Sequence, residues 1–360
     1  MKKRHQHFIP RTYLKYFKNS TDSQQVNTFN KIENKFISNI GINDVCVEKD
    51  FYTLKNLTGE DQLALEEFFD KEIERKYDKV YNLLINEKPF KITIEQKIDI
   101  LKTTLSMYFR TPKVLNQFMF KIDKFIEDLI NDKDIDEIQF KGITIKIDGK
   151  TKQEIKKEIR EHIRVDYLSI QLNFFEEFVK FKIYDGITII ENTSEFDYYT
   201  GDNPVNFTTG SDMFDSNNSI YIPLNPKHCI FIAPPKLEKS GYEIFYQKDN
   251  QMHVHVINSR TYNNSERWII GQGNNFKKSL QKYFELNSTY DSEHPILNSL
   301  KCKTILLSKV LNAMEKNGIK KENSELVKAL KDIKNWDEHK NHIDLVELLK
   351  QFREDDGFDI

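Results

Sequence analysis

Residues 151–191, TKQEIKKEIREHIRVDYLSIQLNFFEEFVKFKIYDGITIIE, contain the transition that decides the fold class. Apolar side chains recur every three or four positions from 151 to 181, which predicts one long helix, and Thr151 with Glu154 forms a capping box at its start. The apolar stripe consists of Ile155, Ile159, Ile163, Tyr167, Ile170, Phe174 and Phe178. A short β-like run at 187–191 follows, so helical sequence gives way to strand-forming sequence at this point.

The sequence before this long helix is mainly helical. Two strands at 25–31 and 35–40 are expected to form a hairpin across 32–34, and a short extended piece is expected at 45–53. Thr93 and Gln96 form a second capping box. Apolar and polar residues alternate in the segment 135–147, as they do in a strand. Helices are predicted at 10–17, 60–85, 93–110 and from Pro112 to about residue 130.

The sequence after the long helix changes to short β-like runs and then to helices. The runs fall at 187–191, 196–200, 219–223, 229–233 and 252–257. Helices are predicted at 259–271, 276–284 and 295–316, followed by a charged helical end.

These patterns predict an α+β fold, in which a helical middle region packs with a mainly antiparallel β-sheet and C-terminal helices follow. The expected domains are 1–290 and a helical extension at 291–360. There is no βαβ alternation and there are only 12 glycines, which argues against Rossmann and P-loop proteins.

The composition excludes several other classes of protein. Aromatic residues make up 12% of the chain, enough for a sizeable core, and 54 basic against 56 acidic residues leave no general charge for coating nucleic acid. The three cysteines are far apart and form no C-x-x-C, so neither a disulfide framework nor a thiolate zinc site is expected. No apolar stretch approaches ~20 residues, so we expect no membrane partner and a cytoplasmic location.

The stretch His7-Phe8-Ile9-Pro10-Arg11 precedes the first predicted helix. If Pro10 is the first helical residue, Ile9 is the cap, and the free amides of the first turn lie near His7 and Arg11. Arg11 can bind a phosphate or carboxylate through two nitrogens, which makes an anion site. The alternative is that His7 is a partly buried residue bonded to the backbone.

Two further polar segments stand at breaks in the pattern. Arg110 ends a helix before Pro112, where it is either a second anion ligand or an ordinary C-terminal cation. Gly201, Asp202 and Asn203 form a turn before Pro204, with Gly201 permitting positive φ. The turn either presents Asp202 as a base, a metal ligand or a partner for a histidine, or is only a turn.

Two histidine pairs have spacings that suit metal ligands. His253 and His255 would face the same side of a strand, and His339 and His342 have helical spacing. Two ligands do not make a metal site, and an exposed surface explains each pair as well. The sequence contains no G-x-S-x-G and no H-E-x-x-H motif.

The opening His7-Phe8-Ile9-Pro10-Arg11-Thr12-Tyr13-Leu14 with Phe17 resembles the start of a bacterial family, the domain of unknown function 4238. Further segments resemble the family in the same order: Asp50-Phe51-Tyr52-Thr53, Arg110-Thr111-Pro112, Gly201-Asp202-Asn203-Pro204-Val205 and Ile222-Pro223-Leu224-Asn225-Pro226. The resemblance covers about residues 5 to 285. Gly201 departs from it, because Ser or Thr is more usual there. The family has no established reaction, but the resemblance implies that its marked polar residues act together.

We therefore hypothesise an enzyme that acts on nucleic acid or nucleotides, with a nuclease-like effector of anti-phage defence as the specific expectation. The catalytic residues would be His7, Asp202 and Asn203, with Asp202 orienting His7 as acid or base. Arg11, Arg110 and Tyr13 would bind the anionic substrate. No metal ligand is assigned, the cofactor is unknown, and a divalent metal is compatible with this chemistry.

Two rival hypotheses are also compatible with the sequence. The same polar residues could hold a nucleotide or carboxylate in a non-catalytic ligand- or protein-binding module, or lock the first helix against the sheet. The C-terminal helices would then form a partner surface or a homo-oligomer. A purely structural protein is the third hypothesis.

Overall fold

The computed structural model describes residues 5–54, 59–117, 119–120, 127, 137–140, 143–146, 149–208, 213–234, 241–249 and 251–292. The contacts divide the chain into residues 1–283 and 284–360. The predicted helix at 295–316, almost all of the predicted extension at 291–360, and His339 and His342 lie outside the described residues.

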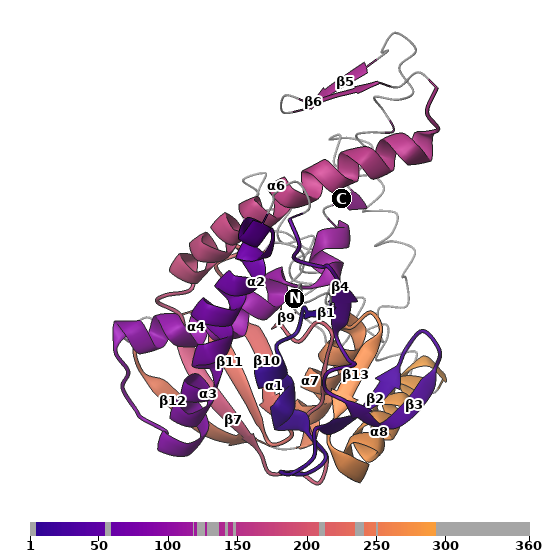
Figure 1. Cartoon of the computed structure of the whole chain (residues 1–360). Helices are drawn as coiled ribbons and strands as arrows, with labels where there is room; N and C mark the ends of the chain where they lie inside the picture. Colours follow the sequence, from indigo (N-terminus) through magenta and orange to yellow (C-terminus); the bar gives the residue numbers. More distant parts are fainter. Residues whose placement is uncertain are drawn as a thin grey trace, which may run out of the picture. The chain divides into compact units, whose positions relative to one another are not determined.

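The α+β class is confirmed, and its largest sheet has five strands (Figure 1). In spatial order they are β12 (Ile244–Asp249), β7 (Gly186–Asn192), β11 (His228–Ala233), β10 (Ile220–Asn225) and β9 (Asn206–Phe207). Neighbours are antiparallel except β12 and β7, which run parallel. The strands at 187–191, 219–223 and 229–233 were predicted, whereas β12 was not.

A second sheet of four strands joins the two ends of the first unit (Figure 1). Its order is β3 (Lys35–Gly41), β2 (Gln25–Asn30), β13 (Trp268–Gly271) and β8 (Thr200–Gly201). β2 and β3 are the predicted hairpin, and β13 pairs antiparallel with β2. A separate pair joins β1 (His5–His7) to β4 (Val47–Lys49). Through the pairing of β2 with β13, the N-terminal hairpin is therefore held by a late part of the chain, whereas β1 pairs with the early β4.

The predicted helices before the sheet are present. α1 (Arg11–Leu14) begins one residue later than expected, with Pro10 as its N-cap, and continues as a 3₁₀ turn, Lys15–Phe17. The predicted helix 60–85 is a continuous helical stretch of changing pitch. Its parts are the 3₁₀ turn Gly59–Leu63, α2 (Ala64–Phe68), the π-helical segment η3 (Phe69–Glu74), α3 (Arg75–Asn82) and the π-helical turn Leu83–Glu87.

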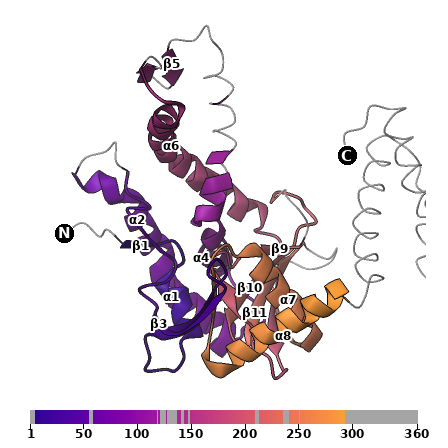
Figure 2. The ribbon, with the colours of Figure 1, turned by 90° about the vertical axis from the view of Figure 1, so that its right-hand side faces the viewer.

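The two longest helices before the large sheet begin at the predicted capping boxes. α4 (Ile94–Phe109) starts at Thr93, and α6 (Lys152–Phe181) starts at Thr151. Of the helix predicted from Pro112 to about residue 130, residues 112–117, 119–120 and 127 are helical, and the rest lies outside the described residues. The alternating segment forms β5 (Glu137–Phe140) and β6 (Ile143–Lys146), at the N-terminal end of α6 (Figures 1 and 2). Among the described helices, none is long and apolar enough to cross a membrane.

Three predictions after residue 195 were wrong in part. Residues 252–257 are not a strand but the first half of α7 (Gln251–Asn264), and the helix predicted at 259–271 ends at 264 before β13. Val254, Ile257 and Thr261 are fully buried, a helical spacing that crosses the expected boundary at residue 258. In the predicted strand 196–200, only Thr200 pairs, because Tyr198 and Tyr199 donate their amides to Pro226 and Asn258 instead. α8 (Gly273–Ser292) contains the last described predicted helix, 276–284.

The hydrophobic core fixes the position of α1. Tyr13, Leu14 and Phe17 are fully buried on one face of the helix, as the spacing predicts. Tyr13 meets Tyr77 of α3 edge-on, with 5.8 Å between the ring centroids. The opposite face of α1, which carries Arg11 and Lys15, borders a pocket.

Candidate ligand pocket beside the first helix

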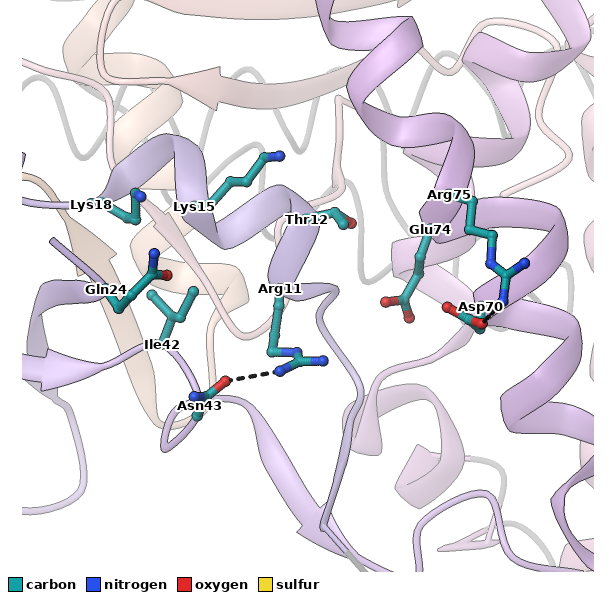
Figure 3. A pocket seen from close by; sticks show the side chains of 10 residues that line it. All are labelled: Arg11, Thr12, Lys15, Lys18, Gln24, Ile42, Asn43, Asp70, Glu74 and Arg75. Atoms are coloured by element: carbon teal, nitrogen blue, oxygen red, sulfur yellow. Dashed lines mark hydrogen bonds and ion pairs between the residues drawn. The ribbon is translucent and has the colours of Figure 1, made fainter. Parts of the chain in front are cut away.

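A cavity of about 430 Å³ lies between α1, the segment after β3 and the helical stretch η3–α3. We call it the α1 pocket (Figure 3). Its lining residues are mostly polar and charged: Arg11, Thr12, Lys15, Lys18, Gln24, Ile42, Asn43, Asp70, Glu74 and Arg75. The volume lies in the range of small-molecule sites, roughly 300–1,000 Å³.

The α1 wall of the pocket is basic. Arg11 is exposed, and its Nη1 donates to Asn43 Oδ1 at 3.1 Å. Lys15 pairs with Asp78 at 2.5 Å, and Lys18 donates to the carbonyl of Thr21 at 3.0 Å. Arg11 therefore has a neutral partner and, among the described residues, no carboxylate within ion-pair distance.

The opposite wall is acidic and belongs to η3. Asp70 and Glu74 are four residues apart, so both face the same side of the helix. Asp70 pairs with Arg75 at 2.8 Å. The carboxylate of Glu74 extends into the space across from Arg11 (Figure 3). The pocket thus has the guanidinium of Arg11 on one side and the carboxylate of Glu74 on the other.

Arg110 lies behind Glu74 and is only 2% exposed. Its Nη2 donates to Glu74 Oε1 at 2.8 Å and to the carbonyl of His7 at 3.0 Å, while Nε donates to the Tyr52 hydroxyl at 3.1 Å. The guanidinium lies 4.4 Å from the centroid of the Phe69 ring. Arg110 therefore orients the acidic wall and does not itself line the pocket.

His7 lies next to the pocket, behind Ile42. Its Nε2 is 3.3 Å from the carbonyl of Ile42, and since a carbonyl only accepts, Nε2 carries the proton and Nδ1 is the basic nitrogen. Burial lowers the pKa of His7, and the nearby Arg11 lowers it further. The imidazole is therefore neutral at pH 7 and bonded to backbone, as the simpler of the two sequence interpretations expects.

Asp202 and Asn203 are bonded to the loop that follows α7. The Asp202 carboxylate accepts the backbone amides of Glu266, Arg267 and Trp268 at 2.7–2.9 Å. Asn203 donates to Asp202 Oδ1 at 3.2 Å, and its carbonyl accepts from Asn264 at 2.8 Å. These bonds hold the link between α7 and β13.

The structure therefore brings together three of the predicted site residues, His7, Arg11 and Arg110, around Glu74. The expected pair of Asp202 with His7 is not formed, because each has the backbone partners described above.

Gly201 and Tyr13 take part in the packing of the fold and do not line the α1 pocket. A Cβ at Gly201 would lie 2.0 Å from Ser265 Oγ, so close packing excludes a side chain; positive φ is not the reason, since Gly201 does not adopt it. Tyr13 is fully buried, and its hydroxyl donates to the carbonyl of Pro223 at 2.7 Å and lies 2.5 Å from Thr200 Oγ1. The phenol thus faces the sheets and not the pocket.

The histidine pair on α7 does not form the expected arrangement. A helix turns successive side chains so that residues two apart point away from each other. His253 lies 3.2 Å from Asp249, whereas the His255 ring packs on Phe196. Within the described ranges, no group of three or more His, Cys, Asp or Glu side chains is arranged to hold a metal ion.

Sequence reasoning missed Glu74 and Asn43, which complete the pocket. Glu74 follows the buried Ile73 and precedes the buried Tyr77 by three positions. A charged residue at the edge of an apolar stripe was the available signal. Asn43, in the turn after β3, carried no comparable signal.

Comparison with known proteins gives one match. The family described as "Protein of unknown function (DUF4238)" matches residues 5–275. No curated protein and no solved structure matches the chain.

Proposed function

This chain belongs to the DUF4238 family of proteins of unknown function, and from that premise we propose that it binds a small anionic ligand in the α1 pocket. The observation that carries the proposal is Arg11, an exposed guanidinium in the pocket, whose one hydrogen-bond partner among the described residues is the neutral Asn43. Its remaining N–H groups suit a phosphate or carboxylate. Lys18, on the same wall, adds a second positive charge.

A binding role fits the surroundings better than catalysis by the predicted residue set. Arg110 is sealed behind Glu74, and the Asp202 carboxylate accepts backbone amides. General acid–base catalysis needs a side chain within hydrogen-bond reach of the reacting group. A binding pocket needs only donors and volume, which Arg11 and the cavity supply.

The first test measures binding of AMP and inorganic phosphate by isothermal titration calorimetry. We expect Arg11→Gln to weaken AMP binding roughly tenfold or more, because a charge-assisted hydrogen bond contributes about 1.5–3 kcal/mol. Arg267→Gln is the matched control, since Arg267 is exposed and lies outside the pocket. Equal weakening in both variants, or no binding by the wild type, would overturn the proposal.

Hydrolysis of a bound nucleotide or nucleic acid is the second candidate. It is motivated by His7, whose Nε2 bonds to the carbonyl of the pocket-lining Ile42 and whose neutral imidazole can accept a proton at Nδ1. The assay incubates the protein with nucleotides, DNA and RNA, with and without Mg²⁺. Product formation that His7→Gln abolishes, at an unchanged melting temperature, would support hydrolysis. If the wild type forms no product, hydrolysis is excluded and ligand binding remains as the proposed function.

A further inference from the structure

The two walls of the α1 pocket differ in which charges are already neutralised. On the acidic wall Asp70 is paired with Arg75 at 2.8 Å, and on the basic wall Lys15 is paired with Asp78. Arg11 and Glu74 face each other across the cavity, Arg11 with the neutral partner Asn43 and Glu74 paired from behind with the buried Arg110 (Figure 3). A ligand that satisfies both needs an anionic end and an end that donates hydrogen bonds.

The carboxylate of Glu74 suits a hydrogen-bond donor that carries no charge. Its Oε1 accepts from the buried Arg110, and in the described part of the chain Oε2 has no hydrogen-bond partner. Since Arg110 already balances the charge of Glu74, a second cation would gain less there than beside a lone carboxylate. Hydroxyl groups, which donate without adding charge, suit Oε2 well. Carboxylates bind ribose hydroxyls in this way in dinucleotide-binding proteins.

The pocket lining offers no aromatic ring for a nucleobase to stack on. None of the ten lining residues is aromatic. Base recognition usually relies on aromatic faces, each worth about 1–3 kcal/mol per stacked base. The lining therefore favours recognition of a sugar and a phosphate over recognition of a base.

Resting on the proposed function, we propose that the ligand of the α1 pocket is a ribose phosphate, free or as the sugar-phosphate part of a ribonucleotide. Its phosphate binds Arg11, and its ribose hydroxyls donate to Glu74, which Arg110 holds in place. The base, where there is one, makes no specific contact. The pocket thus distinguishes ribose from deoxyribose and is indifferent to the base.

The test compares the affinities of ribose 5-phosphate, AMP, UMP, 2′-deoxy-AMP and inorganic phosphate by calorimetry. We expect AMP and UMP to bind within about threefold of each other, and 2′-deoxy-AMP to bind roughly tenfold more weakly than AMP, as for the loss of a hydrogen bond to a charged group. Glu74→Gln should bring the AMP to 2′-deoxy-AMP ratio close to one. Glu67→Gln, which breaks an exposed ion pair with Lys71 outside the pocket, should keep the wild-type ratio.

The outcomes separate this inference from the proposed function. If no phosphate compound binds, the proposed function fails and the inference with it. If AMP and 2′-deoxy-AMP bind equally well to the wild type, anion binding stands and the ribose assignment is wrong. Tighter binding of phosphoethanolamine than of ribose 5-phosphate would also overturn it, since Glu74 would then select an amine. The wild-type ratio needs no variant, so instability of Glu74→Gln does not affect this test.

Discussion

Arg110 links three segments that are far apart in the sequence. One guanidinium bonds to the carbonyl of His7, the hydroxyl of Tyr52 and the carboxylate of Glu74. Its position before Pro112 indicated either a second anion ligand or an ordinary cation at the C-terminal end of a helix. A polar residue in a family motif can serve ligand binding or the packing of segments, and the residue type is the same in both cases. The sequence therefore predicts that Arg110 matters but not in which way.

Replacing Arg110 should destabilise the protein strongly. Arg110→Ala leaves Glu74, Tyr52 and a backbone carbonyl without their donor, and we expect the free energy of unfolding to fall by about 3 kcal/mol. Arg75→Ala, which breaks an exposed ion pair, should change it by less than about 1 kcal/mol. Urea denaturation measures both. Similar small changes in the two variants would show that Arg110 does not stabilise the fold.

At the scale of helices and strands, the regular helices were predictable from the sequence, and the pairings of short strands were not. Thr93 and Thr151 begin α4 and α6 as expected, because a capping box and an apolar stripe are local features. α7 was mistaken for a strand where valine and histidine alternate, since six residues cannot separate the two periods. β8 pairs over only Thr200 and Gly201, and it depends on β13, a distant partner.

The backbone amides of the link between α7 and β13 are held by the side chain of Asp202. Its carboxylate accepts three consecutive backbone amides, and the amide oxygen of Asn cannot replace both carboxylate oxygens. We expect Asp202→Asn to lower the free energy of unfolding by about 2 kcal/mol and to speed hydrogen exchange at Glu266, Arg267 and Trp268.

Asp215→Asn is the control for this substitution, since Asp215 Oδ1 accepts one exposed backbone amide, that of Asn217. Little change is expected there. Unchanged exchange at residues 266–268 in Asp202→Asn would contradict the role assigned to Asp202.

At the scale of the whole molecule, two buried lysines join the helical region to the large sheet. Lys97 of α4 is fully buried and donates to the carbonyl of Asp185, in the turn between α6 and β7. Lys182 is buried beside it, 3.0 Å from the Asp185 carboxylate, and donates to the carbonyl of Asn218 at 2.8 Å. Burial lowers the pKa of Lys97 to about 8, although Asp185 opposes the shift.

This pKa gives stability a defined dependence on pH. An unfolded lysine keeps its proton to about pH 10.4, so between pH 8 and 10 the side chain of Lys97 binds more protons in the unfolded chain than in the folded one. The contribution of Lys97 to stability therefore rises with pH in this range. We expect the free energy of unfolding to rise on the order of 1–2 kcal/mol more from pH 7.5 to 9.5 in the wild type than in Lys97→Met.

Urea denaturation at steps of pH measures this difference. Lys31 and Lys113, whose pKa values burial also lowers, contribute equally to both proteins and cancel. Parallel pH profiles for wild type and Lys97→Met would contradict the assignment.

The pocket was only partly predictable because it depends on the fold of the whole first unit. His7, Arg11 and Arg110 were chosen from the sequence and lie around Glu74, whereas Asp202 and Asn203 lie at the end of α7. Which motif residues converge depends on strand pairings such as β2 with β13, and no local pattern specifies these.

The hydrogen bonds of Tyr13 have a consequence for the order in which the protein can fold during its synthesis on the ribosome. Its hydroxyl partners, Thr200 and Pro223, lie 187 and 210 residues further along the chain. At about 5–20 residues per second, synthesis leaves the first helix without these partners for on the order of ten seconds or more. The Tyr13 hydroxyl lacks both partners during this interval, although its ring can already pack on Tyr77 of α3. The first helix therefore cannot complete its bonds to β8 and β10 until residue 223 has been synthesised.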